Sequence, residues 1–225
     1  MRSWLHNKGV LTEWTHQAVS RLEVFPDHGH KNRAIWRIYL PHACHVLQSN
    51  LVAEDDHNRI NLAWKIALCY YGDGRFIEAE ALFRKVIAYQ TKVLGPEHSD
   101  TLRSVAKLAL ACHDRSQFSE AKALGPRAME AQRTILGEED PETLSTMSHL
   151  AMTFRDLSEW KEAVELELHT MEIRKRVLGV EHPDTLVGMS NLVYLYNCQG
   201  WWKQAEELGK QSFRNRSTAH VERYE

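Results

Sequence analysis

The chain has 225 residues, of which 43% are hydrophobic and 26% are charged, and its formal net charge is −2. This balance provides no basic field that would favour nucleic acid or an anionic membrane surface. No apolar run approaches the ~20 residues needed to span a bilayer, and the first residues lack the charged-then-apolar pattern of a secretion signal. We therefore expect neither nucleic acid nor membrane among the partners.

Cysteine usage points to the compartment. The four cysteines, Cys44, Cys69, Cys112 and Cys198, are widely spaced and form no Cys-x-x-Cys pair. This spacing argues against a disulfide framework or a zinc site and favours a reducing compartment. We predict buried free thiols and a cytoplasmic location.

Residues 1–57 form a leading segment with helical periodicity. Apolar residues recur at helical spacing within 11–25 and again within 34–51. Pro41 should break or kink the second run. We interpret the segment as a helical cap that shields the repeat beginning at residue 58, as is usual at the ends of repeat arrays.

One phrase then recurs with a fixed period of 42 residues. It reads Leu-Gly-Pro-Glu-His-Ser-Asp-Thr-Leu at 94–102, Leu-Gly-Glu-Glu-Asp-Pro-Glu-Thr-Leu at 136–144 and Leu-Gly-Val-Glu-His-Pro-Asp-Thr-Leu at 178–186. A fixed period of this size is the signature of a repeat array. The sequence therefore predicts an all-α solenoid of antiparallel helix pairs.

Each copy of the phrase reads as the end of one helix and the start of the next. A glycine that can take the left-handed conformation closes the first helix: Gly95, Gly137 and Gly179. The following helix should begin after an N-cap residue: His98, Asp140 and His182. In the last two copies a proline follows at the first helical position, where its missing N–H costs nothing. We interpret the repeated histidines as caps rather than as metal ligands or catalytic groups.

Four repeats are predicted, at 58–99, 100–141, 142–183 and 184–216, before a tail at 217–225 that should be disordered or frayed. Their first helices should span roughly 58–71, 100–114, 142–156 and 184–198. Their second helices should span roughly 75–94, 118–136, 160–178 and 202–215. The connectors within each pair are short, so the two helices must be antiparallel neighbours.

Two departures interrupt the pattern. Gly125-Pro126 lies inside a second helix, where a proline costs ~3 kcal/mol, and this predicts a kinked or split helix. After Phe213 the periodicity ends without a Leu-Gly stop. The last repeat is therefore expected to leave a face that is exposed or needs a partner.

Aligned positions of the second helices carry an aromatic residue followed by alanine. The aromatic positions are Phe76, Phe118, Trp160 and Trp202, and the alanines are Ala79, Ala121, Ala163 and Ala205. This pattern resembles the tetratricopeptide repeat, whose usual period is ~34 residues. The longer period, the recurring phrase and the segments Trp160-Lys-Glu-Ala163 and Met171-Glu-Ile-Arg-Lys-Arg-Val-Leu-Gly179 resemble the kinesin light chain variety. The resemblance implies a right-handed superhelix.

The leading segment is similar to a second feature of fungal repeat proteins. Trp4-Leu5, Trp14, Phe25-Pro26 and Leu40-Pro-His-Ala43 resemble the bridge between repeats and a nucleotide-binding switch domain of the NB-ARC or NACHT type. These NLR-like proteins carry near-identical arrays. No Gly-x-x-x-x-Gly-Lys-Ser/Thr loop occurs in the 225 residues, so the resemblance implies a partner-binding or sensor arm without ATPase activity or a cofactor.

In this repeat class the first helices line a concave face that holds peptides. Helical spacing selects the positions expected to face a partner: Asn61, Trp64, Lys65, Tyr71, Arg103, Lys107, His149, Met152, Arg155, Asn191, Tyr194 and Asn197. Asn191 resembles the groove asparagine that family members use to hold a peptide backbone. We expect Trp64, Arg155 and Tyr194 to matter most, because aromatic and arginine side chains dominate binding hot spots.

Two other functions stay open. The array could self-associate weakly by stacking through its C-terminal repeat, where Trp201, Trp202 and Phe213 lie. A metal-dependent enzyme is less favoured, because His28-Gly-His30 and His42-Ala-Cys-His45 lack the further ligands of a known metal site. We predict a non-catalytic scaffold for a protein or peptide, with no catalytic residue, metal or cofactor.

Overall fold

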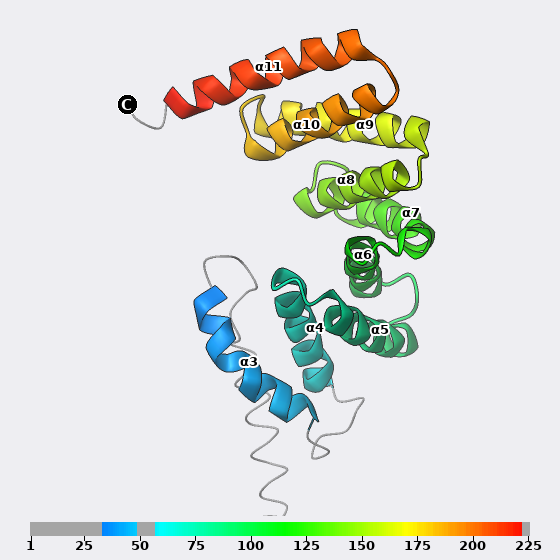
Figure 1. The fold of residues 1–225 in the computed structure, drawn as a ribbon. Coiled ribbons are helices and arrows are strands. Elements are labelled where there is room, and N and C mark those ends of the chain that lie inside the picture. The colour runs from blue at the N-terminus through cyan, green and yellow to red at the C-terminus, as the bar shows by residue number, and fades with distance from the viewer. Residues whose placement is uncertain (1–32, 49–56, 222–225) are drawn as a thin grey trace, which may run out of the picture. The chain divides into compact units, whose positions relative to one another are not determined.

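The computed structural model describes residues 33–48 and 57–221, and all regular secondary structure in these ranges is α-helical (Figure 1). The predicted all-α class is confirmed. The first compact unit contains helices α3 (Arg33–Gln48), α4 (His57–Gly72), α5 (Phe76–Val93) and α6 (Ser99–Asp114). The second contains α7 (Phe118–Ile135), α8 (Pro141–Asp156), α9 (Trp160–Leu178), α10 (Pro183–Cys198) and α11 (Trp202–Val221). The helical run expected at 11–25 lies outside the described residues.

The helices from α4 to α10 begin and end within one residue of the predicted bounds. Helix α11 differs, because it continues to Val221. Residues 217–221 are therefore helical where we expected a frayed or disordered tail, and residues 222–225 lie outside the described part. The reason is local: no proline or glycine follows Gly209, so nothing in the sequence stops the helix.

The joints between helix pairs turn at the glycines of the recurring phrase. The three glycines of the recurring phrase have φ values of +98°, +94° and +92°. At Gly179 ψ is 165°, so the left-handed conformation that we expected there is wrong, and this residue occupies an extended positive-φ region that is essentially restricted to glycine. A substitution with a side chain at this joint would be strained.

The predicted N-caps are confirmed. His98 Nδ1 accepts from the Asp100 amide at 3.2 Å, and His182 Nδ1 accepts from the Asp184 amide at 3.2 Å. Asp140 does more, because one carboxylate oxygen accepts from two amides of α8, at 2.8 and 3.4 Å. These bonds satisfy N–H groups that have no partner inside the helix.

The connectors inside the pairs share a feature that sequence reasoning did not predict. One residue of each connector has positive φ, and these residues are spaced by the period: Gly74, Ser116, Ser158 and Gly200. Both serines have a φ of +60°, which is uncommon for a residue with a side chain. The tight turn therefore imposes the conformation even where the sequence does not supply glycine.

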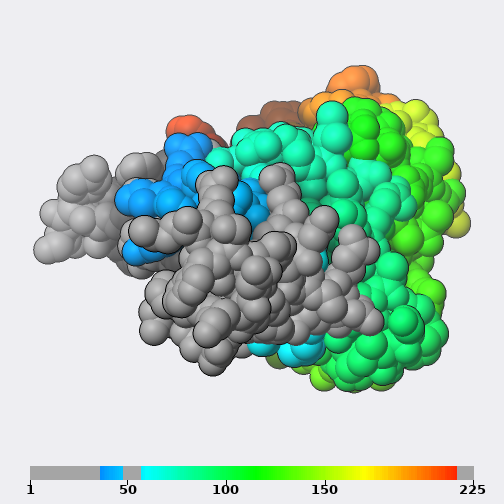
Figure 2. Space-filling model, turned by 90° about the horizontal axis from the view of Figure 1, so that it is seen from below, coloured from blue at the N-terminus to red at the C-terminus, as the bar shows by residue number. Residues whose placement is uncertain are grey.

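In the first unit, α3 packs against α4 (Figure 2). Trp36, which is 1% exposed, lies with Leu40 and Ala43 in a cluster that includes Ile66 and Cys69 of α4. Burial raises the pKa of the Cys69 thiol to about 12. All four cysteines are free, but the expectation of burial is wrong for Cys198, which is exposed, and Cys44 is half-buried.

In the second unit, Gly125 and Pro126 do not split α7, which runs unbroken from Phe118 to Ile135. Gly125 is buried, and a Cβ there would lie 2.8 Å from Leu150 Cδ1, so the glycine allows α7 and α8 to approach closely. Pro126 is exposed. Water can therefore reach the carbonyl one turn earlier that lacks its amide donor, and the helix tolerates the loss.

None of the described helices is both long enough and apolar enough to cross a membrane.

Candidate functional site

A pocket of about 330 Å³ lies between the helices of the first repeat and the start of the second. We name it the α4–α6 pocket. It is lined by His57, Ile60, Asn61 and Trp64 of α4, Tyr89, Gln90 and Val93 of α5, Leu94, and Asp100, Arg103 and Ser104 of α6. Aromatic rings, side-chain amides, a hydroxyl and charges of both signs thus meet in one concave site, which is the composition expected of a ligand pocket.

Three of the predicted partner-facing residues line this pocket: Asn61, Trp64 and Arg103. Trp64 is half-buried and its ring meets Phe83 edge-on, with centroids 5.4 Å apart. Asn61 Nδ2 lies 3.1 Å from His57 Nε2. The packing against Phe83 holds the indole in place, while Asn61 and Arg103 remain exposed at the surface of the pocket.

Two lining residues were missed by sequence reasoning because they belong to a second helix. Tyr89 and Gln90 come from the last turns of α5. Gln90 Oε1 accepts from Ser104 Oγ at 2.6 Å, which ties α5 to α6 in the pocket wall. The sequence feature that could have revealed Gln90 is the glutamine one period later, Gln132.

The other predicted residues of the first unit do not line the α4–α6 pocket. Lys65 and Lys107 are half-buried on α4 and α6. The Tyr71 ring packs on Phe76 with centroids 5.5 Å apart. Burial, together with a hydrogen bond to Asp114, raises the pKa of the Tyr71 phenol above its usual range. Tyr71 therefore contributes mainly to intramolecular packing.

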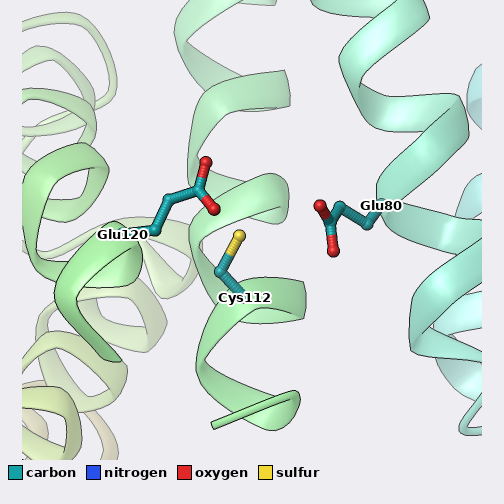
Figure 3. A group of neighbouring side chains, drawn as sticks. All are labelled: Glu80, Cys112 and Glu120. Carbon is teal, nitrogen blue, oxygen red and sulfur yellow. The ribbon is translucent and has the colours of Figure 1, made fainter. Parts of the chain in front are cut away.

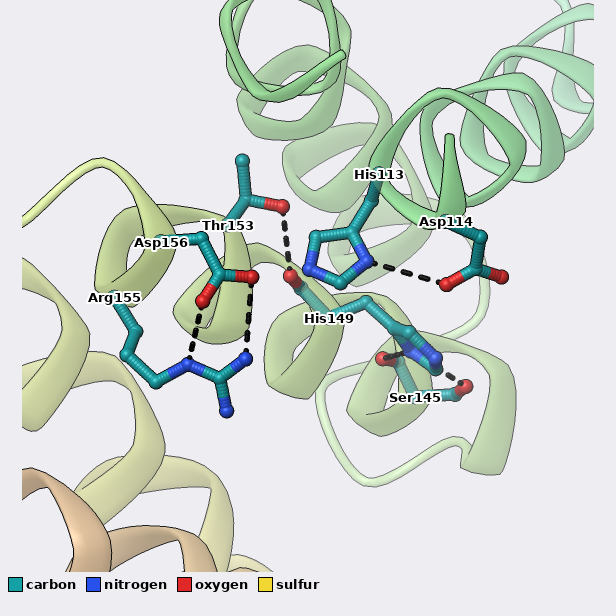
Figure 4. Close-up of polar contacts among 7 residues, drawn as sticks. All are labelled: His113, Asp114, Ser145, His149, Thr153, Arg155 and Asp156. Carbon is teal, nitrogen blue, oxygen red and sulfur yellow. Dashed lines mark hydrogen bonds and ion pairs between the residues drawn. The ribbon is translucent and has the colours of Figure 1, made fainter. Parts of the chain in front are cut away.

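In the second unit, α8 and α10 bring two predicted residues together. The Arg155 guanidinium lies over the Tyr194 ring, 5.4 Å from its centroid. Asp156 orients this guanidinium, because its two oxygens accept from Arg155 Nε at 2.8 Å and Nη2 at 3.1 Å (Figure 4). This hydrogen bonding raises the pKa of Arg155. Tyr194 is 54% exposed, so the pair offers a cation and an aromatic face to solvent.

Two further predicted residues of the second unit make intramolecular bonds. His149 Nδ1 donates to the Ser145 carbonyl oxygen at 2.7 Å, which assigns the proton to Nδ1 (Figure 4). Asn191 Nδ2 donates to Glu167 Oε1 at 2.9 Å. One amide donor of the asparagine expected to hold a peptide is therefore used inside the protein. Met152 is half-buried, and Asn197 is exposed.

Glu167 is the centre of a buried polar cluster that sequence reasoning missed. Its side chain is 1% exposed, and burial raises its pKa, with partial opposition from Asn191 and Arg174. Arg174 donates to Ser148 Oγ at 2.9 Å and to the Leu144 carbonyl at 3.2 Å. The sequence feature that could have revealed this cluster is a glutamate at a position where the other repeats carry Phe83, Gly125 and Gly209.

A carboxylate and a thiol on facing helices of the first unit have the donor types of a metal site. Glu80 lies on α5 and Cys112 lies on α6 (Figure 3). The oxygen and sulfur atoms that could bind a metal lie within 4.8 Å of each other. Burial would raise the pKa of Glu80, but hydrogen bonds from Arg115 and Arg84 lower it. The carboxylate is thus ion-paired with two arginines.

The described architecture can be compared with that of known proteins. Sequence profiles described as tetratricopeptide repeat match residues 58–134 and 143–184, which together are more than half of the chain. The chain belongs to the tetratricopeptide repeat family. The profiles cover the helices that form the α4–α6 pocket and α8 and α9 of the second unit.

Solved structures agree with this family. Crystallised TPR-like repeats from Podosopora anserina, of the kinesin light chain type, are 26% identical, cover 90% of this chain and 98% of theirs, and superpose with a TM-score of 0.72. BtubC from P. vanneervenii is 17% identical, covers 97% of this chain and 86% of its own, and has a TM-score of 0.65, which shows the fold alone. The resemblance to the kinesin light chain variety is confirmed.

A curated relative matches part of this tetratricopeptide protein. An NLR-like protein of Hyaloscypha variabilis is 34% identical over 106 residues, which is 46% of this chain. The match spans only 11% of that relative's length.

Proposed function

We propose that this tetratricopeptide protein is a non-catalytic scaffold that binds a protein or peptide partner along its first helices. The α4–α6 pocket carries the proposal. Three independently predicted residues, Asn61, Trp64 and Arg103, converge there beside Tyr89 and Gln90. Amides and a guanidinium can bind the backbone and polar groups of a peptide, while the aromatic rings cover its apolar side chains.

Arg155 and Tyr194 supply a second contact in the second unit. Arginine and tyrosine are enriched at hot spots because each provides a large contact area with a polar end. Asp156 holds the guanidinium in one orientation, so less side-chain freedom is lost on binding. Lys107, Met152 and Asn197 remain proposed contacts, whereas Tyr71 and Asn191 mainly support the structure.

The similarity to an NLR-like protein supports a role for the scaffold within a larger protein. We propose that the chain acts as the partner-binding arm of a larger NLR-like protein in the cytoplasm. The four free cysteines fit a reducing compartment.

A peptide selection tests the scaffold. The purified chain would be panned against a phage-displayed library of random dodecapeptides, and the selected peptides titrated by fluorescence anisotropy. Arg103→Glu and Trp64→Ala should each weaken binding by ~tenfold or more, because both remove a pocket contact. Lys161→Glu is the control, since Lys161 is exposed on the second helix α9. Equal affinities for Arg103→Glu, Trp64→Ala and the parent chain would refute the pocket as the binding site.

The second contact has its own test with the same peptides. Arg155→Glu and Tyr194→Ala should weaken the binding of those peptides that contact the second unit, and Lys161→Glu should leave it unchanged. If no selected peptide responds to either substitution, the Arg155–Tyr194 pair has no part in binding.

One observation favours self-association as a second candidate function. On the last helix, Phe213 is 73% exposed and Trp202 is 65% exposed. The residue aligned with Phe213 in α9 is Met171, which is 9% exposed and packs with Leu186 and Met189 of α10. Exposed apolar residues at a position that packs elsewhere are typical of an association surface.

Sedimentation velocity separates this function from the scaffold. The sedimentation coefficient should rise with concentration for the parent chain, and Phe213→Glu should abolish the rise. A coefficient independent of concentration would exclude self-association, and it would leave the peptide-binding proposal intact.

A further inference from the structure

A second and larger cavity, of about 510 Å³, lies between α3, α4 and α5. We name it the α3–α5 cavity. Ile60 and Tyr89 line both this cavity and the α4–α6 pocket, so the two sites adjoin at these two residues. Leu47 of α3, Ala63 of α4 and Leu82 of α5 complete its apolar wall.

The sequence explains why this repeat has an open cavity. Ala63 lies at a position where the later repeats carry Val105, Met147 and Met189. Both methionines are buried, at 2% and 3% exposure. A side chain shorter by three heavy atoms leaves space in the first repeat that the third and fourth repeats fill.

Basic side chains surround this apolar space. Arg59 stands where the other repeats carry a buried threonine, and its Nη2 donates to the Leu47 carbonyl at 2.7 Å. Arg59 is only 9% exposed, so its charge lies in the wall of the cavity. Lys85 and Lys92 add two exposed cations from one face of α5. None of the described residues that line the cavity is acidic.

The polar composition distinguishes this cavity from the partner-binding pocket. Among its described lining residues there is no asparagine, glutamine, serine or threonine, and Tyr89 supplies the uncharged hydroxyl. The α4–α6 pocket, by contrast, contains Asn61, Gln90 and Ser104. A peptide backbone presents N–H donors as well as carbonyl acceptors, and lysine and arginine can only donate, whereas an alkyl chain with one anionic group requires only apolar walls and cations.

We propose that the α3–α5 cavity binds a small amphipathic carboxylate. Its alkyl chain lies along Leu47, Ile60, Ala63 and Leu82, where each buried methylene contributes ~0.8 kcal/mol. Its carboxylate lies between Lys85 and Lys92, with the Arg59 charge in the adjacent wall. The site goes beyond the proposed scaffold function and does not depend on it.

Three ligands with ten-carbon chains test the headgroup preference by isothermal titration calorimetry on the full chain. Decanoate should bind with one molecule per chain. Decanol should bind ~tenfold more weakly, because it lacks the charge-assisted bonds, and decyltrimethylammonium should not bind. Equal affinity for all three ligands would mean non-specific partition onto an apolar surface and would overturn the proposal.

Ala63→Met tests the location. This substitution introduces the residue that the third and fourth repeats carry naturally, and it should reduce decanoate affinity by ~tenfold or more by filling the cavity. Val105→Met, at the aligned position of α6, is the matched control and should bind decanoate as the parent does. Equal affinity of the parent and Ala63→Met would place the ligand elsewhere.

Charge reversal provides a second route if Ala63→Met impairs folding, as thermal unfolding would show. Lys85→Glu combined with Lys92→Glu should abolish decanoate binding while leaving the apolar wall intact. Arg103→Glu removes a cation from the α4–α6 pocket only and should leave decanoate binding unchanged. Loss of binding in Arg103→Glu, or retention in the double lysine variant, would refute the assignment.

Discussion

The two units fill the same core position with side chains of opposite polarity. Phe83 of α5 and Glu167 of α9 are two periods apart, so they occupy the same register position. Phe83 is 0% exposed and meets Trp64 edge-on. Glu167 is 1% exposed, and Ser148 replaces the tryptophan at the aligned position of α8. We call the position of Phe83 and Trp64 the aromatic slot, because an aromatic contact fills it. We call the position of Glu167 and Ser148 the polar slot, because hydrogen bonds fill it.

The neighbours change together with the central residue. Where the first unit has Gln90, which bonds Ser104, the second has Arg174, which bonds Ser148 and the Leu144 carbonyl. A buried carboxylate is tolerated only with hydrogen-bonding or charged partners. Because each repeat packs only on its neighbours, a slot can change chemistry without disturbing distant repeats.

The largest expected effect is at the aromatic slot. Phe83→Ala removes a fully buried ring and its contact with Trp64, and it should lower the free energy of unfolding by ~3–5 kcal/mol. Urea denaturation followed by circular dichroism measures this change. Phe83→Leu, which preserves most of the apolar volume, should cost less than half as much. A small loss for Phe83→Ala would mean that the aromatic slot does not dominate the first unit.

The polar slot should respond less strongly, and its members should act together. Arg174→Gln introduces the residue that the first unit carries, removes two of the bonds to α8 and takes a cation away from Glu167. We expect a loss of ~1–3 kcal/mol. In a double-mutant cycle, Glu167→Gln with Arg174→Gln should cost less than the sum of the single changes. Strict additivity would show that the two charges are independent.

The pH dependence of stability distinguishes the two slots further. Burial raises the folded-state pKa of Glu167 above its unfolded value of 4.5. The folded state therefore holds the proton more tightly, and this contribution is complete below the unfolded pKa and is lost as pH rises through the folded pKa. Glu167→Gln should flatten this part of the stability curve.

Glu138 provides a control of opposite sign. A hydrogen bond from His169 lowers its pKa, so its contribution is present above the unfolded pKa and is lost as pH falls. Glu138→Gln should leave the loss at rising pH intact. Identical curves for the parent chain and Glu167→Gln would remove Glu167 as the source of that loss.

The smallest effects are expected at the joints, where the units also differ. Asp140 accepts from two amides and is followed by Pro141, whereas His98 accepts from one amide and is followed by Ser99. Asp140→Ala should cost ~1 kcal/mol and His98→Ala ~0.5 kcal/mol. Thermal unfolding of the two variants at one pH compares them directly. A greater loss of stability for His98→Ala than for Asp140→Ala would contradict this prediction.

The helices and their joints could be predicted from the sequence, because the interactions that form them are local. Positive φ at Gly95 and capping by Asp140 depend on residues within one turn. Sequence reasoning placed Trp64 and Arg103 on one face, and the structure brings them into one pocket. It did not find Tyr89 or Gln90, because their part in that pocket depends on how α5 packs against α4 and α6.

The outcomes at Asn191 and Pro126 have different origins. Asn191 was expected to serve a peptide, but it bonds a carboxylate on the neighbouring helix. Pro126 was expected to kink or split α7, and the helix is not split, with Gly125 fitted closely against Leu150. For Asn191 a contact between helices, which a period of one helix cannot reveal, decided the outcome, and for Pro126 the exposure of its position did.

The amino-acid sequence by itself determined the repeat period, the helix pairs, the caps and the family of this protein. These features follow from short-range backbone preferences and from the spacing of apolar residues. Only the tertiary structure decided which residues of different helices share a cavity, and which core positions are polar. Such pairings depend on the angle and distance at which helices pack, because side chains far apart in the sequence meet only when those helices are in place.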